Sequence, residues 1–213
     1  MYRYVLFDFD GTVFDTLEGI TKSVRFAINK VGMDAPLSEL KCFAGPPLLE
    51  MFEERFGFTP EKAAQAVRDF RERYVPVGVY ESRVFPGVKE LLRELRAAGI
   101  VTGIATSKPQ HLAEELLGRE EMIGLFDVIS GSAPDGRNES KQQVTQRAMG
   151  FLGAAPEETV LVGDTKYDVA GAHKCGIKCI GVGYGYAAEG ELEAAGVDYM
   201  AADVDEIKNI VLN

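Results

Sequence analysis

The chain has 213 residues, of which 46% are hydrophobic and 26% are charged. These proportions are ordinary for a globular protein and argue against disorder as the state of the whole chain. Lys and Arg number 23 against 33 Asp and Glu, which gives a formal net charge of −10. This balance argues against a nucleic-acid polymer or an anionic membrane surface as partner, because both would be repelled. A small anionic substrate stays compatible with it, since a bound cation reverses the sign of the local field.

Neither secretion nor membrane insertion is expected. Apolar runs fall short of the roughly 20 residues that cross a bilayer, and the N-terminus reaches acidic residues too early for a signal peptide. An odd cysteine count is unfavourable for a disulfide framework. His173, Cys175 and Cys179 lack a fourth partner at the spacing of a zinc site. We therefore expect a cytoplasmic protein with buried or incidental thiols.

Short apolar runs alternate with segments of helical periodicity along most of the chain. The first run, Tyr4-Val5-Leu6-Phe7, leads into Asp8-Phe9-Asp10-Gly11 and indicates a buried strand that opens into a turn. Such alternation predicts a doubly wound parallel α/β sheet with right-handed crossovers. Further strands are predicted at 100–105, 128–130, 159–162 and 177–182, and helices at 88–98, 112–117, 144–152 and 169–174.

The interval from Leu17 to Glu81 interrupts this alternation. It carries helical patterns at 20–31, 48–56 and 63–74 and no convincing strand. About 60 helical residues inserted after the first strand are expected to form a small bundle of their own. We therefore predict an α/β core of residues 1–15 and 82–213 and a helical domain of residues 16–81.

Polar side chains gather where the predicted strands end, and ligands of open α/β sheets bind at those carboxyl ends. The candidates comprise carboxylates, hydroxyls and one amine from four separate segments: Asp8, Asp10, Thr106, Ser107, Lys141, Asp164 and Asp168. Clustered carboxylates are costly without a cation among them. Oxygen ligands without His or Cys select Mg²⁺.

These residue types suit phosphoryl chemistry. A carboxylate such as Asp8, held against Mg²⁺, can attack a phosphoryl group while the metal and Lys141 spread the charge of the transition state. Asp10 stands two residues further on and could protonate the leaving oxygen, then deprotonate a water. The hydroxyls of Thr106 and Ser107, beside backbone N–H groups, suit the non-bridging phosphate oxygens.

The sequence resembles the haloacid dehalogenase-like hydrolases over nearly its whole length. Asp8-Phe9-Asp10-Gly11-Thr12 is similar to the nucleophile motif of that family. Thr106 corresponds to its second motif, Lys141 to its third, and the stretch 163–168, Gly-Asp-Thr-Lys-Tyr-Asp, resembles its fourth. All four motifs occur in the order and at the strand ends that the family requires.

This resemblance implies roles for single residues. Asp8 is implied to become phosphorylated and Asp10 to act as the acid/base, which points to a phosphatase and away from a dehalogenase. The Asp8 carboxylate and the Asp10 backbone carbonyl are implied to bind Mg²⁺. Asp164 is implied to be a further ligand and Asp168 to support the metal, through water or directly. The helical insertion is implied to be a cap that closes over the site and selects the substrate.

Two subgroups of the family bear on the substrate. Phe43-Ala44-Gly45-Pro46-Pro47-Leu48 and the stretch 131–137, Gly-Ser-Ala-Pro-Asp-Gly-Arg, look more like bacterial 5′-nucleotidase-like proteins than like phosphoglycolate phosphatases. Gln142 stands where the second group usually has Pro. The resemblance therefore implies hydrolysis of a nucleoside monophosphate, or alternatively phosphoglycolate, by a monomer or small homo-oligomer. A sugar phosphomutase, a pyrophosphatase or a non-catalytic binding protein of the same fold are further alternatives.

Some of these residues also fit a purely structural role. Thr106 could cap a helix that starts near Pro109, and Arg137 rivals Lys141 as the basic group. Gly45-Pro46-Pro47 fits a plain interhelical turn as well as a substrate-facing loop.

Two sets of residues in the helical interval have the same ambiguity. Lys22 and Arg25 fit either a solvated helix face or a site for an anionic group. Four aromatic residues fit the bundle core better than a base-stacking platform: Phe52, Phe56, Phe58 and Phe70.

Overall fold

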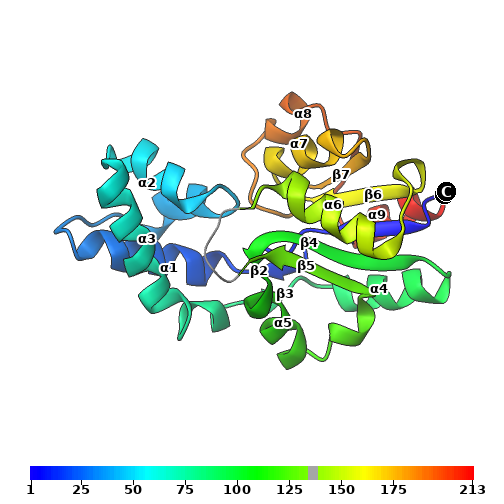
Figure 1. Ribbon diagram of the computed structural model, residues 1–213, viewed down its shortest axis with the longest axis horizontal. Helices are drawn as coiled ribbons and strands as arrows, with labels where there is room; N and C mark the ends of the chain where they lie inside the picture. The colour runs from blue at the N-terminus through cyan, green and yellow to red at the C-terminus, as the bar shows by residue number, and fades with distance from the viewer. Residues whose placement is uncertain (134–138) are drawn as a thin grey trace. The chain divides into compact units, whose positions relative to one another are not determined.

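The computed structural model of the chain describes residues 1–133 and 139–213. A parallel sheet of six strands, in the order β5-β4-β1-β6-β7-β8, forms the centre of the larger part (Figure 1). Every neighbouring pair in it is parallel. The strands are β1 (Tyr4–Phe7), β4 (Val101–Pro109), β5 (Val128–Ser132), β6 (Thr159–Gly163), β7 (Lys178–Val182) and β8 (Tyr199–Ala201). The doubly wound α/β sheet predicted from the sequence is confirmed.

Helices cover both faces of this sheet. Figure 1 shows α6 and α7 on one side of it and α4 and α5 on the other, and α9 packs against α4. The helices are α4 (Val88–Ala97), α5 (Gln110–Arg119), α6 (Lys141–Leu152), α7 (Lys166–Lys174), α8 (Glu191–Ala194) and α9 (Val204–Leu212), with the 3-10 helices η3 (Ile123–Leu125) and η4 (Pro156–Glu158). The edge strand β8 and the helix α9 were not predicted from the sequence.

The core of this part lies between the middle strands and the helices α6 and α7. Leu6 of β1 and Leu161 of β6 are fully buried there against Val144 of α6 and Val169 of α7. Burying such side chains contributes about 1.5–3 kcal/mol each. The helix α6 begins at a capping box, in which Ser140 and Gln143 satisfy each other's backbone N–H groups. Packing and capping together fix the start of α6, and with it Lys141.

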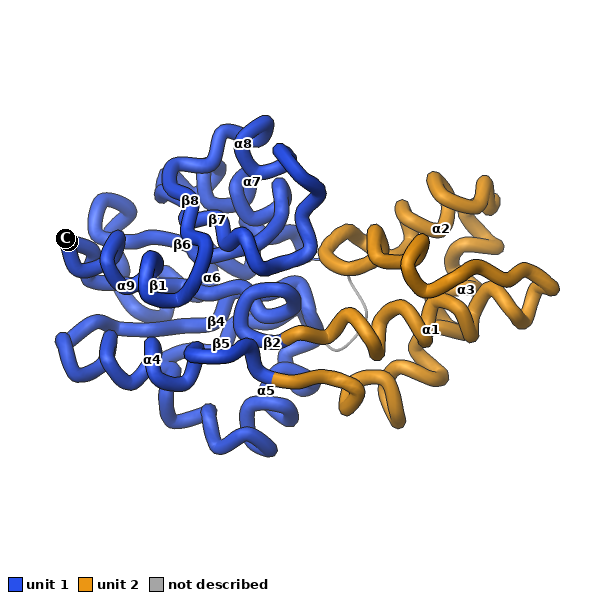
Figure 2. Tube along the Cα trace, turned by 180° about the vertical axis from the view of Figure 1, so that it is seen from behind, with its two compact units in different colours: residues 1–14, 84–213 blue, residues 15–83 orange. Residues whose placement is uncertain are grey.

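The chain divides into two compact units, one made of residues 1–14 and 84–213 and the other of residues 15–83 (Figure 2). The second unit is helical: α1 (Leu17–Asn29), the 3-10 helix η1 (Leu37–Phe43), α2 (Leu48–Phe56), α3 (Pro60–Tyr74) and the 3-10 helix η2 (Gly78–Tyr80). The stretches that connect the units form a small two-stranded pair, β2 (Phe14–Asp15) with β3 (Arg83–Val84).

Aromatic side chains fill the second unit. Phe52 is fully buried, and its ring centroid lies 5.0 Å from that of Phe43 and 6.2 Å from that of Phe58. Phe70 is buried against Tyr74, with centroids 4.9 Å apart. These residues form the bundle core, as their spacing predicted. Within the described part of the chain, no helix has both the length and the apolar character needed to cross a bilayer.

Candidate active site

Lys141, the first residue of α6, connects three segments at the carboxyl ends of the strands. Its Nζ contacts Oδ1 of Asp8, lies 2.9 Å from Oδ1 of Asp168 and donates to the carbonyl of Ala105 at 3.1 Å. The side chain of Lys141 is only 7% exposed. Burial opposes its charge, but Asp168 and Asp8 together raise the pKa of Lys141 above its usual value. Lys141 is therefore held as a cation beside Asp8.

Asp8, Asp164 and Asp168 form an acidic cluster. Each offers an oxygen, and these oxygens lie within 4.8 Å of one another. Asp8 directly follows β1, where its N–H donates to the carbonyl of Val162 in β6 at 2.8 Å. Asp164 and Asp168 are fully buried. Two carboxylates that follow strands, Asp8 and Asp164, and one from the first turn of α7 (Lys166–Lys174), Asp168, thus meet in one small space next to Lys141.

Two members of the cluster, Asp8 and Asp164, have a raised proton affinity. Burial raises the pKa of Asp8 to about 6, Asp168 adds to the rise, and Lys141 acts against it. Burial also raises the pKa of Asp164 well above its usual value, and the charges of Asp168 and Asp8 add to this. A charged state of all three carboxylates therefore calls for a cation.

The donor set fits Mg²⁺. All of the converging groups are hard oxygen ligands, the type that Mg²⁺ binds. Gly11, with a φ of 85°, leaves room for Asp164, because a Cβ at this position would lie 2.1 Å from Oδ2 of that residue. Asp168 also forms the capping box of α7, where its Oδ2 accepts hydrogen bonds from the N–H and the hydroxyl of Thr165. Its remaining oxygen faces Lys141, which agrees with a supporting position at the edge of a metal site.

Asp10 lies outside this cluster and pairs with a residue that the sequence did not single out. Nζ of Lys108 lies 3.0 Å from Oδ1 and 3.3 Å from Oδ2 of Asp10. Lys108 belongs to the Thr-Ser-Lys end of β4, where the strand is irregular between Ala105 and Pro109. The sequence signal that could have identified Lys108 is its position directly after Thr106 and Ser107, the two hydroxyl residues predicted to bind phosphate. Its pairing with Asp10, which is far away in the sequence, was not visible in the sequence.

Thr106 and Ser107 differ in their surroundings. Thr106 is 2% exposed, and its Oγ1 accepts a hydrogen bond from the N–H of Lys108 at 3.2 Å. Ser107 is exposed, and its carbonyl accepts from the hydroxyl of Ser132. The alternative that Thr106 caps the next helix is wrong, because the N-cap position of α5 is Pro109 and has no side-chain hydrogen bond.

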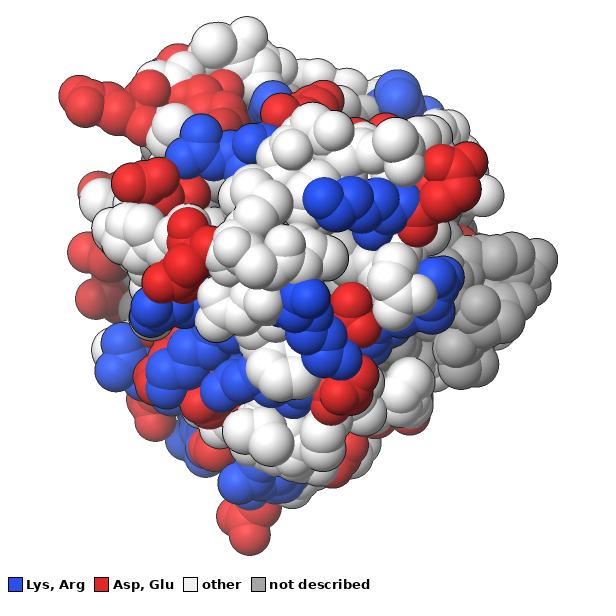
Figure 3. Space-filling view, turned by 90° about the vertical axis from the view of Figure 1, so that its left-hand side faces the viewer, with Lys and Arg blue, Asp and Glu red and all other residues white. Residues whose placement is uncertain are grey.

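Lys22 and Arg25 of α1 are both engaged in ion pairs within the second unit. Nζ of Lys22 lies 2.6 Å from Glu18 and 3.0 Å from Glu81, and Arg25 binds Asp34 at 2.7 Å. Figure 3 shows the same intermixing of Lys and Arg with Asp and Glu over a whole face. This favours the interpretation of Lys22 and Arg25 as a solvated, charge-paired helix face.

The other residues that the sequence analysis considered are the cysteines, His173 and Arg137. The cysteines are free thiols, and in the described residues only the cluster of Asp8, Asp164 and Asp168 has the geometry of a metal site. Nε2 of His173 lies 2.9 Å from Asp198. Arg137, the rival of Lys141, and most of the stretch 131–137 lie outside the described residues.

The family model of the haloacid dehalogenase-like hydrolases matches residues 5–182. The chain belongs to this family. It is 40% identical, over 99% of its length and 96% of the relative, to a protein of Pseudomonas aeruginosa named 5′-nucleotidase. It is 35% identical, over 97% of its length and 71% of the relative, to the tyrosine-protein kinase PtkA of Mycobacterium tuberculosis.

A solved structure agrees with this membership. The crystal structure of a predicted phosphatase from Clostridium acetobutylicum superimposes with a TM-score of 0.95 at 38% identity and covers 100% of this chain and 99% of that one. As a member of the haloacid dehalogenase-like hydrolases with such relatives, the chain is a phosphatase.

Proposed function

We propose that the chain is a cytoplasmic, Mg²⁺-dependent phosphomonoester hydrolase that works through an aspartyl-phosphate on Asp8, with a nucleoside 5′-monophosphate as the favoured substrate. The observation that carries the mechanism is the position of Lys141, whose Nζ contacts Asp8 and lies 2.9 Å from Asp168 beside the buried Asp164. A nucleophile, a fixed cation and a place for a metal thus adjoin one another. This is the combination that phosphoryl transfer to a carboxylate requires.

In the first half of the reaction, an oxygen of Asp8 attacks the phosphorus and the bond to the leaving oxygen breaks. Asp10 donates a proton to that oxygen. Asp8, Asp164 and the Asp10 carbonyl would hold Mg²⁺, supported by Asp168, and the bound ion supplies Lewis-acid stabilisation of phosphoryl charge. Lys141 keeps Asp8 ionised and oriented, and the buried Thr106 is proposed to bind a non-bridging oxygen together with Ser107.

In the second half, Asp10 accepts a proton from water, and this water attacks the phosphorus of the aspartyl-phosphate. The bond between phosphorus and the Asp8 oxygen breaks, which releases orthophosphate and restores the carboxylate. Asp10 thus ends in the protonation state in which it began.

We propose that the second unit is a cap that selects the substrate. It contains a cavity of about 550 Å³, which is roomy for a small ligand. Three acids outnumber two bases in its lining, and several hydroxyls accompany them: Asp15, Glu18, Glu81, Lys41, Arg83, Thr21, Ser38, Tyr80 and Ser82. Such a lining suits a neutral, polar organic group better than the carboxylate of phosphoglycolate. This supports the nucleotide as substrate, in agreement with the name of the Pseudomonas relative.

The mechanism is tested by the variant Asp8→Asn, with Asp198→Asn, at the His173 ion pair, as the matched control. We expect Asp8→Asn to lose at least about a thousandfold in kcat for phosphate release, because the nucleophile is gone. The control keeps the wild-type rate. Turnover by Asp8→Asn at the wild-type rate would refute the mechanism.

The substrate is tested by kcat/KM over a panel of nucleoside monophosphates, phosphoglycolate, sugar phosphates and pyrophosphate, with and without Mg²⁺. We expect the nucleotides to rank first and EDTA to abolish activity. Release of orthophosphate without any protein acceptor separates hydrolysis from transfer to tyrosine. A preference for phosphoglycolate or pyrophosphate would contradict the assignment of the substrate but leave the role of Asp8 intact.

A further inference from the structure

A short segment after β7 holds one member of the acidic cluster in place. The N–H of Tyr186 donates to Oδ2 of Asp164 at 2.8 Å, and the hydroxyl of Thr12 donates to Oδ1 of the same residue at 3.1 Å. Both oxygens of a fully buried carboxylate therefore accept a hydrogen bond from the chain. Since each carboxylate oxygen has two acceptor positions, each keeps one for a further partner. The two donors thus restrict the orientation of Asp164 without exhausting its capacity as a ligand.

Gly185 makes this arrangement possible by its lack of a side chain. A Cβ at this position would lie 2.2 Å from the Cβ and 2.6 Å from Oδ2 of Asp164. Real Cβ atoms do not approach other atoms so closely, so any other residue would displace either the segment or the carboxylate. The backbone between Tyr184 and Tyr186 is consequently in direct contact with Asp164.

Tyr184, the residue before Gly185, contacts Thr12 and Phe85. Its hydroxyl donates to the carbonyl of Thr12 at 3.1 Å, and its ring packs against Phe85 with centroids 4.9 Å apart. Burial raises the pKa of Tyr184, so the phenol stays protonated and remains a donor. Tyr184 thus holds the backbone of Thr12, the residue whose side chain holds Asp164. We call the set of Thr12, Tyr184, Gly185 and Tyr186 the tyrosine clamp.

We propose that the tyrosine clamp positions Asp164 for Mg²⁺ and links the metal site to the chain on either side of the second unit, at Thr12 and Phe85. The proposal rests on the Mg²⁺-dependent function proposed above. Three ionised carboxylates whose oxygens lie within 4.8 Å of one another repel one another, so an ionised and unrestrained Asp164 would turn away from Asp8 and Asp168. Hydrogen bonds behind a metal ligand prevent this and preorganise the site.

The clamp predicts a loss of metal affinity in a variant that keeps every proposed ligand. Tyr184→Phe removes the hydrogen bond to Thr12 but keeps the ring against Phe85. We expect its dissociation constant for Mg²⁺, measured by calorimetry in the absence of substrate, to rise about tenfold, a typical effect for a group that supports a metal ligand. The rise of the melting temperature on addition of Mg²⁺ should shrink accordingly.

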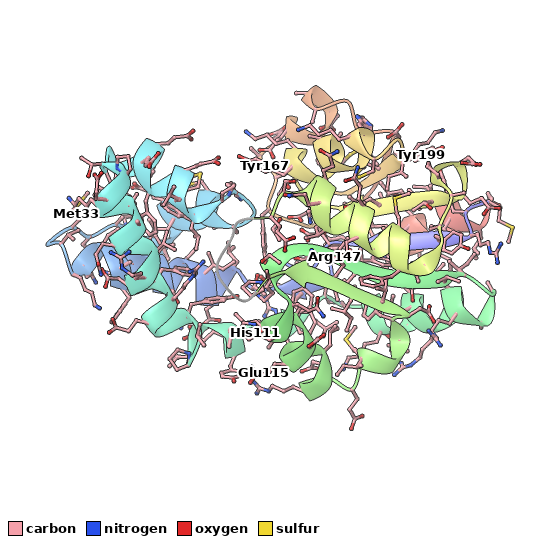
Figure 4. The ribbon with its side chains drawn as sticks, in the orientation of Figure 1. Met33, His111, Glu115, Arg147, Tyr167 and Tyr199 are labelled. Atoms are coloured by element: carbon pink, nitrogen blue, oxygen red, sulfur yellow. The ribbon has the colours of Figure 1, made fainter. Side chains whose placement is uncertain are left out.

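Two further variants identify the cause. Gly185→Ala acts on the same clamp through the backbone and should weaken Mg²⁺ binding at least as much as Tyr184→Phe. The matched control is Tyr199→Phe, which removes a phenol that is hydrogen-bonded to Tyr2 and Lys178 and lies on β8 (Figure 4). It should bind Mg²⁺ as the wild type does. If Tyr184 had a purely structural role, Tyr184→Phe would have a lower melting temperature in the absence of Mg²⁺ but an unchanged dissociation constant for Mg²⁺.

A double variant tests the order of the contacts. Thr12→Val removes the hydroxyl through which Tyr184 acts on Asp164, so Thr12→Val with Tyr184→Phe should bind Mg²⁺ no more weakly than Thr12→Val alone. Additive losses would contradict the proposed chain of contacts.

Asp164→Asn separates the clamp from the proposed function. If this variant loses Mg²⁺ binding while Tyr184→Phe and Gly185→Ala bind as the wild type does, the clamp is refuted and the metal site stands. If Asp164→Asn also binds Mg²⁺ as the wild type does, the metal site itself is refuted.

Discussion

Nζ of Lys108 lies 3.0 Å from Oδ1 of Asp10, and the lysine side chain is 2% exposed. This ion pair orients the carboxylate proposed as the acid/base. The same ammonium group lies over the ring of Phe9, 5.4 Å from its centroid, so the face of this ring also contacts the lysine. A buried lysine at this position fixes the orientation of the Asp10 carboxylate, which has to accept a proton from water in the second half of the reaction.

Replacement of Lys108 should therefore slow the hydrolysis of the aspartyl-phosphate. For Lys108→Met we expect kcat to fall about tenfold to a hundredfold, within the range that general acid/base catalysis contributes. With p-nitrophenyl phosphate, whose leaving group needs no proton, the first half should stay fast. A burst of p-nitrophenol, equal in amount to the enzyme, should then precede slow turnover in a stopped-flow experiment.

Lys89→Met is the control for this experiment, because Lys89 forms an ion pair with Glu120 away from the cluster. It should keep the wild-type kcat and show the wild-type time course. If Lys108→Met turned over at the wild-type rate, or lost activity without a burst, a role of Lys108 in the second half of the reaction would be refuted.

Binding of Mg²⁺ should depend on pH, because protons compete for the same carboxylates. Burial and neighbouring charge raise the pKa of Asp8 to about 6 and that of Asp164 well above its usual value. Below about pH 6, the metal must displace protons from the cluster, and the dissociation constant should rise about tenfold per pH unit for each proton released. Calorimetry in two buffers of different ionisation enthalpy counts these protons. A constant affinity between about pH 5.5 and about pH 7.5 would contradict the pKa shift of Asp8.

The same shift predicts how the metal-free protein responds to pH. The pKa of Asp8 is higher in the folded chain than its usual value of 3.8. The folded state therefore binds this proton more tightly, and the resulting stabilisation is lost as the pH rises from about 4 through about 6. At about pH 7.5 in EDTA, the free energy of unfolding of Asp8→Asn, measured by urea denaturation, should exceed that of the wild type by on the order of 1–3 kcal/mol. Near pH 5 this difference in the free energy of unfolding should shrink. If Asp8→Asn were less stable than the wild type at both pH values, the prediction would be refuted.

Most of the sheet could be predicted from the sequence because its strands are buried on both faces. Leu6 and Leu161 belong to continuous apolar runs, which mark such strands without any knowledge of their partners. The edge strand at Tyr199 was missed, because three residues with an exposed Met200 give no such run. Helix α3 of the second unit was recognisable from its helical periodicity, since Phe70 and Tyr74 lie four residues apart and are both buried.

The site was predictable to the extent that it follows from strand ends. Asp8 and Asp164 meet because parallel strands bring their carboxyl ends together, and Lys141 reaches them from the start of α6. The contacts of Lys108 with Asp10 and of Tyr186 with Asp164 depend on an irregular strand end and on a loop conformation. Neither leaves a periodic pattern in the sequence, so these positioning groups emerged only from the structure.

Arg147 of α6, labelled in Figure 4, binds to β5, one of the two edge strands of the six-stranded sheet. Its guanidinium donates to the hydroxyl of Ser130, to the carbonyl of Gly131 and to the carboxylate of Glu139. Arg147→Met should therefore destabilise the fold by about 1–3 kcal/mol, because these partly buried acceptors lose a charged donor. Urea unfolding of the metal-free protein measures this loss, and the Mg²⁺ affinity of the folded variant should not change.

The control for Arg147 is Arg96→Met, which removes an ion pair of 3.2 Å with Asp127 whose side chains are 38% and 37% exposed. An exposed pair contributes about 0–1 kcal/mol, so this variant should unfold close to the wild type. Glu139→Gln combined with Arg147→Met should recover part of the loss, since the carboxylate that has lost its cation is then neutral. Equal destabilisation by Arg147→Met and Arg96→Met would show that the contacts to Ser130 and Gly131 at the sheet edge add nothing to stability.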